Sequence, residues 1–222
     1  MSLILNIDTA LDTASVCLAN GEEILQLSFN KNQKDHAAWL HTTIAETLKK
    51  NGIAANQLEA IGVTIGPGSY TGLRVGLAAA KGLCFALKIP LIAISTLEVI
   101  AYSVKNEAEN IICPMIDARR MEVFAAVYDK SMNEKIPAHS LIIDETSFAS
   151  ELISGNVLFC GNGSKKLQAL ITDKNANFST VVHTASHLAA LSMLRYQKKE
   201  FADLAYIEPL YGKEFFTPPR KS

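Results

Sequence analysis

The chain of 222 residues lacks a strong net charge: 21 basic and 22 acidic residues give −1 at pH 7. Without a surplus of positive charge, no long-range field draws it to nucleic acid or to an anionic membrane. Any RNA contact would therefore be local or made by a partner. Hydrophobic residues make up 49% and charged residues 19%, which is typical of a globular chain and not of a disordered one. The length allows one domain or two small ones.

Long apolar runs and paired cysteines are also missing. No run reaches the ~18 apolar residues that a transmembrane helix needs. The opening "MSLILNID" has neither a charged n-region nor a cleavage site, so no signal peptide is predicted. The four cysteines are widely spaced in apolar runs without a Cys-x-x-Cys motif. We expect them to be buried thiols in a reducing cytoplasm, not disulfides or metal ligands.

The order of strand and helix patterns indicates two similar lobes. Strand patterns at 3–8, 15–20 and 22–29 precede a helix, a strand, a second helix and a further strand. After the polar stretch 105–110 a similar order recurs with shorter elements, ending in a helix at about 184–196. We therefore expect lobes at 1–104 and 105–222, and the last helix could return to the first lobe.

The most distinctive stretch is "IGPGSYTGLRVGLAAAKGL" at 65–83, between a strand and a helix. It is not a P-loop, because no glycine is followed by Lys-Ser or Lys-Thr. It is not the dinucleotide fingerprint, because Thr71 stands where the third glycine belongs and no acidic residue follows ~20 positions later. Two interpretations remain: a generic anion site at a helix N-terminus, or glycines that let a helix pack closely on its strand.

The end of the first strand could complete such an anion site. Asp8 could hold a hydrated magnesium, and the hydroxyl of Thr9 could contact a phosphate. ATPases with a similar opening follow the acid with glycine, whereas Thr9 and Ala10 stand here; Asp8 could equally cap a turn. The candidate nucleotide-binding residues are Asp8, Thr9, Gly66, Gly68, Ser69, Thr71 and Gly72.

Other charged and imidazole side chains do not form a convincing catalytic set. Arg74 and Lys81 lie seven residues apart on one helix face, which would suit an anion, an acidic partner or a solvated surface. His183 and His187 are four apart, but no Glu follows the first as in His-Glu-x-x-His, and we expect surface histidines. The sequence predicts no catalytic residue, no metal site and no cofactor.

Four stretches together carry a family resemblance. "NIDTALDTASVCLANG", "DHAAWLHTTI", "IGPGSYTGLRVGLAAAKGLCFALKIPLIAISTLE" and "PMIDARRMEVFAAVYD" resemble the TsaB family, also called YeaZ. The resemblance covers about residues 1–130 well and the remainder loosely. It implies an α/β chain with the actin-like ASKHA (ribonuclease H-like) fold, in which each of two related lobes has a mixed sheet flanked by helices.

The resemblance also implies a role beside a catalytic relative. The family is similar to TsaD, which belongs to the group once called peptidase M22 and binds metal through two helical histidines four apart. Here Leu40 stands four residues after His36, so the metal pair is missing. The implied role is a non-catalytic subunit that supports TsaD and the ATPase TsaE in making threonylcarbamoyladenosine at adenosine 37 of tRNA, with tRNA bound only through the complex.

Two helices, at about 36–50 and 71–88, are the predicted partner face, which could also form a homodimer when the partner is absent. The alternatives are an actin-like ATPase or sugar-kinase-like enzyme, and an M22-type metalloprotease. Notable basic residues are confined to Arg119-Arg120 and Arg220-Lys221. The predicted partner residues are His36, Trp39, Leu40, Thr43, Leu73, Arg74, Leu77, Ala80 and Lys81.

Overall fold

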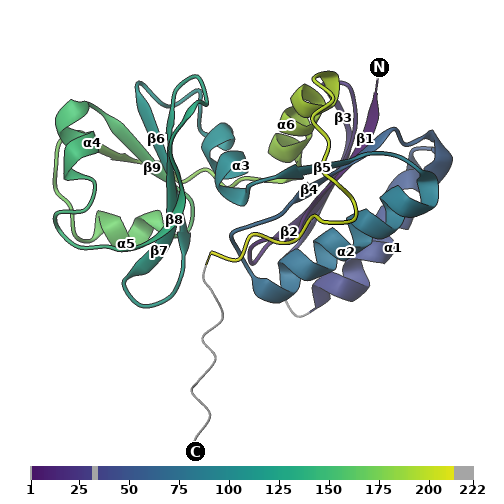
Figure 1. Ribbon diagram of the computed structural model, residues 1–222, viewed down its shortest axis with the longest axis horizontal. Helices are drawn as coiled ribbons and strands as arrows, with labels where there is room; N and C mark the ends of the chain where they lie inside the picture. Colours follow the sequence, from purple (N-terminus) through teal and green to yellow (C-terminus); the bar gives the residue numbers. More distant parts are fainter. Residues whose placement is uncertain (1, 32–34, 213–222) are drawn as a thin grey trace, which may run out of the picture.

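Two mixed five-stranded sheets lie side by side in the computed structural model, which describes residues 2–31 and 35–212 (Figure 1). The first sheet has the order β3-β2-β1-β4-β5, with β1–β2 and β2–β3 antiparallel and β1–β4 and β4–β5 parallel. Its strands are β1 (Leu3–Asp8), β2 (Ala14–Asn20), β3 (Glu23–Asn30), β4 (Ala60–Thr64) and β5 (Leu91–Ile94).

The second sheet repeats this topology. Its order is β10-β9-β6-β7-β8, again with two antiparallel and two parallel pairings in corresponding places. A repeated topology of this kind is the two-lobed α/β architecture expected for the actin-like ASKHA fold, and the predicted fold class is confirmed. The strands are β6 (Ile111–Asp117), β7 (Glu122–Asp129), β8 (Glu134–Ile142), β9 (Val157–Cys160) and β10 (Ala176–Phe178).

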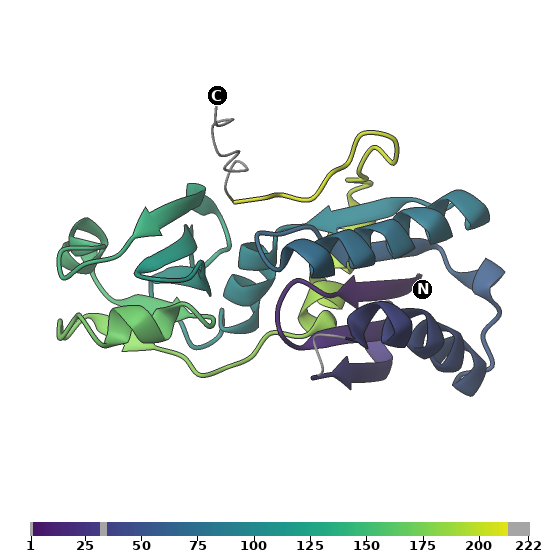
Figure 2. The ribbon, with the colours of Figure 1, turned by 90° about the horizontal axis from the view of Figure 1, so that it is seen from below.

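Helices cover both faces of the first sheet (Figures 1 and 2). Side chains alternate between the faces of a strand, so Leu5 and Ile7 of β1 pack with the helices α1 and α2, while Ile4 packs with α6. These helices are α1 (His36–Lys50), α2 (Tyr70–Leu87) and α6 (Ala185–Gln197). The last helix therefore belongs to the core of the first lobe, although its sequence follows the second.

The remaining helices are short. The helix α3 (Thr96–Ser103) packs against the second sheet through Leu97 and Ile100, so the two lobes exchange helices across the predicted boundary at 105. Between α1 and β4 lies a single 3-10 turn, η2 (Ala55–Gln57), and the second lobe carries α4 (Ala149–Ser154) and α5 (Ser164–Gln168).

Residues 201–212, which we call the C-terminal strap, run along α2 toward the second lobe (Figures 1 and 2). Ala202 N donates to Leu91 O at 2.8 Å, and Leu210 N donates to Ile65 O at 2.7 Å. The backbone of Gly212 lies against the ring of Phe124 on β7. The strap thus crosses from the first lobe to the second. The remainder of the proline-containing tail, including Arg220-Lys221, lies outside the described residues.

The cysteines are buried thiols, as predicted. Cys17, Cys84, Cys113 and Cys160 are buried free thiols. Burial raises the pKa of Cys17 and of Cys84 to about 12, so both are protonated at neutral pH and poor nucleophiles. Over the residues described, we find no helix with the length and apolarity to span a membrane.

Candidate functional site

The carboxyl ends of β1 and β4 meet at one edge of the first sheet, because the two strands are parallel neighbours. Asp8 ends β1 and is about 1% exposed. Its Oδ1 accepts hydrogen bonds from the hydroxyl of Thr64 at 2.8 Å and from Ala10 N at 3.1 Å. Its Oδ2 lies 3.1 Å from His183 Nε2. The carboxylate is therefore engaged on both oxygens by the chain itself.

Burial and charge act in opposite directions on Asp8. Burial alone would raise the pKa of its carboxyl group, but the charge of the neighbouring His183 and the hydrogen bonds from Thr64 and Ala10 outweigh burial. The net pKa lies below its ordinary value. Asp8 is thus a carboxylate held ionised under the cleft by an internal imidazole.

The prediction of surface histidines is wrong for His183, and His187 is half-buried. The side chain of His183 is only 8% exposed and precedes α6, in the segment that returns from the second lobe. His187 closes the N-terminus of α6, where its Nδ1 accepts from Thr184 N at 3.0 Å. Burial, together with the charge of His183, lowers the pKa of His187. Sequence spacing alone could not reveal the contact with Asp8, which is 175 positions away in the chain.

The glycine-rich loop packs closely on the turn after β1. The hydroxyl of Thr9 donates to Gly72 O at 2.7 Å, and Ser69 N donates to Ala10 O at 2.6 Å. A Cβ added at Gly68 would collide with Ala10 O, and one added at Gly72 with Thr9 O. Gly66 has a positive φ of 116°, a conformation that favours glycine, whereas Gly68 does not. At Gly68 and Gly72, the space that a phosphate would need is therefore occupied by the backbone of Thr9 and Ala10.

A cleft of about 520 Å³ opens between the two lobes above this loop. Its first-lobe wall includes Asp12 and three predicted site residues, Gly68, Ser69 and Thr71. Its second-lobe wall is formed by residues 116–119, Phe124 and Asn162. Asp8 and Thr9 were predicted in the same site, but they lie buried beneath it and do not line it.

Arg119 is a cleft residue that the sequence analysis treated only as part of a basic turn. It lines the cleft from the turn between β6 and β7. Both Arg119 (φ 70°) and Arg120 (φ 48°) adopt the left-handed conformation, which costs a non-glycine residue roughly 1–2 kcal/mol. The turn is fixed by Arg119 N, which donates to Asp117 Oδ1 at 2.6 Å, and by Lys166, whose Nζ lies 2.6 Å from the same oxygen.

Ser69 caps α2, and its contribution can be measured. Its side chain accepts a hydrogen bond from Gly72 N at 3.3 Å. Ser69→Ala should lower the free energy of unfolding by about 1 kcal/mol, because a helix N–H loses its acceptor. Ser95→Ala is the matched control: Ser95 is the N-cap of α3 but makes no side-chain capping bond. Equal losses in urea titrations of the two variants would contradict the assigned cap.

Much of the predicted partner face belongs to the chain's own core, and that part of the prediction is corrected. The side chains of Leu40 and Thr43 on α1, and of Leu73, Leu77 and Ala80 on α2, are buried. Their 3–4 residue spacing places them on the helix faces that pack against the first sheet and each other. Except for Leu77, which also lines a surface groove beside residues 207–211, they cannot offer surface to a partner without unfolding the lobe. The predicted helical spacing is correct, but the residues that it groups lie on the helix faces that point into the protein core.

Other predicted members remain accessible. Arg74 is exposed, and Trp39 and Lys81 are half-buried. His36 begins α1, but its side chain lies outside the described part. Beyond the predicted set, Phe85 of α2 has 80% of its surface exposed. The outer surfaces of α1 and α2 are thus available, and they carry a large aromatic residue that the sequence analysis did not single out.

Within residues 2–31 and 35–212, no three His, Cys, Asp or Glu side chains gather in a way that could hold a metal ion.

Comparisons with known proteins place this geometry in context. The family model described as TsaD, tRNA N6-adenosine threonylcarbamoyltransferase, matches residues 30–210. The chain is 28% identical over 213 residues to the tRNA threonylcarbamoyladenosine biosynthesis protein TsaB of Bacillus subtilis (strain 168), covering 94% of this chain and 93% of that protein. It is 33% identical over 132 residues to TsaB of Escherichia coli (strain K12), covering 59% and 56%.

A solved structure described as YeaZ from Pseudomonas aeruginosa has the same fold. It superposes with a TM-score of 0.83 at 24% sequence identity, covering 95% of this chain and 100% of that one. A second Pseudomonas aeruginosa structure, described as an uncharacterized protein with similarity to peptidase YEAZ, gives 0.84, also at 24% identity. At this identity the likeness concerns the fold alone.

Proposed function

Because this chain belongs to the TsaB (YeaZ) branch of the TsaD family, we propose that it is a non-catalytic subunit in the biosynthesis of threonylcarbamoyladenosine in tRNA. In this role it binds and activates a TsaD-like subunit, which transfers the threonylcarbamoyl group to N6 of adenosine 37 in tRNAs that read ANN codons. A TsaE-like ATPase joins the complex, and tRNA is bound only by the assembled complex. The place of action is the cytoplasm, and the chain alone could pair with a second copy.

The observation that carries this proposal is the sealed end of β1. In a nucleotide-dependent member of the fold, an acidic strand end and a glycine loop would face the ligand. Here Asp8 is paired with His183, and Thr9 is bonded to the backbone of Gly72. Both side chains face inward, so the loop 65–72 serves packing, and any nucleotide role of its residues is vestigial.

The outer surfaces of α1 and α2 are the proposed partner face. Arg74, Trp39 and Phe85 are accessible there, and arginine and aromatic residues are enriched in protein interfaces. Lys81 adds a second accessible cation. The buried members of the predicted set support these helices from inside. They matter for the fold of the face and not for contact with the partner.

Reconstitution tests the proposal. The chain is combined with the TsaD-like and TsaE-like subunits of the same cells, tRNA, ATP, threonine and bicarbonate, together with the enzyme that makes threonylcarbamoyl-AMP. Omitting the chain should reduce modification about tenfold or more, the scale of coupling between an activator and a site. The chain alone should hydrolyse no ATP and cleave no peptide.

ATP hydrolysis by the isolated chain would overturn the proposal and favour the ATPase or sugar-kinase-like alternative, with the cleft around Ser69, Thr71 and Arg119 as its site. Peptide cleavage that a chelator abolishes would favour the M22-type metalloprotease. Full modification in the absence of the chain would exclude an activating role.

A further inference from the structure

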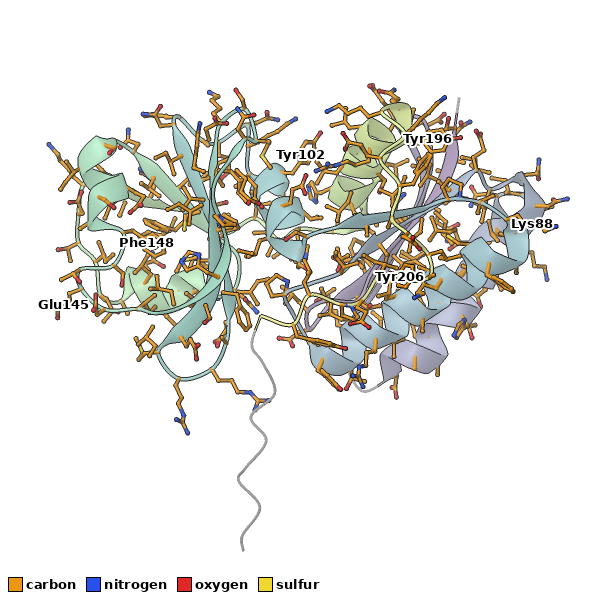
Figure 3. The ribbon with its side chains drawn as sticks, viewed as in Figure 1. Lys88, Tyr102, Glu145, Phe148, Tyr196 and Tyr206 are labelled. Atoms are coloured by element: carbon orange, nitrogen blue, oxygen red, sulfur yellow. The ribbon has the colours of Figure 1, made fainter. Side chains whose placement is uncertain are left out.

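A groove of about 370 Å³ lies between α2 and the C-terminal strap. The helix wall includes Arg74, Ala78 and Lys81, and the strap wall includes Ile207, Pro209 and Tyr211. The strap is exposed along its outer side: Tyr206, labelled in Figure 3 beside α2, has 83% of its surface accessible. The groove therefore faces solvent beside the proposed partner face.

The strap wall is held in place before any partner arrives. Lys81 Nζ donates to Ile207 O at 3.2 Å, and Leu210 N donates to Ile65 O at 2.7 Å. The side chains of Leu204 and Ile207 pack against the main core of the first lobe. A ligand entering the groove would thus meet a formed surface and would not have to order a loose segment, which would cost affinity.

Arg74 is held between two aromatic rings. Its guanidinium carbon lies 3.9 Å from the ring centroid of Tyr70 and 5.6 Å from that of Tyr211. Its Nε donates to the Tyr211 hydroxyl at 2.7 Å. Cation–π contacts of this kind orient a guanidinium, whose remaining N–H groups can still donate to a planar anion.

In the part of the chain that the structure covers, no acidic side chain forms an ion pair with the two cations of the groove. The ion pairs found among those residues engage Lys50, Lys135, Lys166, His183 and Arg195, and none includes Arg74 or Lys81. Glu208 lies on the strap wall but pairs with neither cation. Two such cations beside one groove indicate an anionic occupant.

We infer that this groove receives carboxylate side chains of the partner subunit, with Arg74 and Lys81 as the groups that bind them. The inference rests on the proposed function and names a contact within the partner face. A protein carboxylate fits better than an RNA phosphate for two reasons. Ala78, Ile207 and Pro209 provide apolar surface for the neighbouring side chains of a protein. With Glu208 beside Arg74 and Lys81, two positive charges and one negative charge leave the groove at +1, which suits a side-chain carboxylate better than the repeated charges of RNA.

Charge reversal in the groove tests the inference. The probe is the purified TsaD-like subunit of the same cells, and the measurement is its Kd for the chain by calorimetry at low and high salt. Arg74→Glu and Lys81→Glu should each weaken binding about 10-fold, and the double variant about 100-fold or more, because an unpaired charge is left at the interface. The salt dependence of Kd should also become weaker.

Two further variants separate charge from folding. Lys165→Glu makes the same charge change on an exposed residue of α5 in the other lobe, and it should leave Kd unchanged. Lys81→Gln keeps a donor for Ile207 O but removes the charge, so it should still weaken binding. Arg74→Glu should fold normally, since the side chain at this position is exposed and its replacement leaves no buried charge.

Each outcome has a distinct meaning. Selective weakening by the groove variants supports the inference. Unchanged affinity in all variants, with the wild-type chain still binding the subunit, overturns the groove contact and leaves the proposed function intact. If the variants weakened tRNA binding by the assembled complex but left subunit affinity unchanged, RNA would be the occupant of the groove. That result would also overturn the inference. Absence of binding by the wild-type chain would remove the proposed function and the inference together.

Discussion

Replacing His183 with alanine should lower the free energy of unfolding by about 3–5 kcal/mol, the largest effect that we predict for a single substitution. The reason is the state of Asp8. Its carboxylate is about 1% exposed and lies 3.1 Å from His183 Nε2. Without the imidazole, Asp8 keeps its bonds to Thr64 and Ala10 but must either carry an unpaired buried charge or take up a proton. Chemical denaturation of both proteins at pH 7 measures the difference.

The appropriate control is a histidine outside the core. His139 is half-buried on β8, and its Nδ1 lies 2.9 Å from the nearby Pro137 O, so His139→Ala should change stability by no more than about 0.5 kcal/mol. Adding Asp8→Asn to His183→Ala should recover part of the loss, because the stranded charge is removed. If His183→Ala cost no more than His139→Ala, the pair would not be holding the returning segment to the first sheet.

Asp8 also predicts a pH dependence. Since its folded pKa lies below its ordinary value, its contribution to stability is present above the unfolded pKa of about 3.9. That contribution is lost as the pH falls through the folded pKa. The difference in free energy of unfolding between the wild-type chain and Asp8→Asn should therefore be largest at neutral pH. This difference should shrink as the pH falls below about 4. A gap that stayed constant down to pH 3 would contradict an ionised, paired Asp8.

The fold was largely predictable from the sequence because its signals are local. The Asn20-Gly21 turn joins β2 to β3, and Asn51-Gly52 follows α1, so hydrophobic periodicity and turn residues indicate most of the first-lobe elements. The repeated order of strands and helices indicates two lobes. The sequence also allows the last helix to return to the first lobe, although only the packing of Leu188 and Leu191 on Ile4 shows which sheet α6 covers.

The site was less predictable because its decisive contacts are not local. The sequence around Asp8 contains no signal that His183, at the end of the second lobe, contacts its carboxylate. The same helical spacing that marks Leu73 and Leu77 as one face cannot distinguish a face toward the core from a face toward a partner. Conversely, the spacing of Arg74 and Lys81 does predict a shared face, but the strap that completes their groove comes from more than 120 residues later.

The glycines of α2 give the second large prediction. Gly72→Ala should destabilise the chain by about 3 kcal/mol, the upper part of the range for overpacking a filled site. A Cβ at this position would collide with Thr9 O, and a backbone atom in the turn that follows β1 cannot move aside as a flexible side chain could. The hydrogen bond from the Thr9 hydroxyl to Gly72 O holds the two segments together, so the strain would be shared by the whole strand end.

Gly82 provides a control within the same helix. A Cβ added there meets nothing within 4 Å, so Gly82→Ala should stabilise the chain by about 0.5–1 kcal/mol through helix propensity. The same Gly→Ala substitution would then change stability in opposite directions at two positions ten residues apart. Helix propensity alone cannot produce such a difference. If the glycine at 72 served only the approach of a phosphate, Gly72→Ala would behave like Gly82→Ala in urea titrations. Opposite signs would instead mean that Gly72 is retained for the close contact between the start of α2 and the turn after β1.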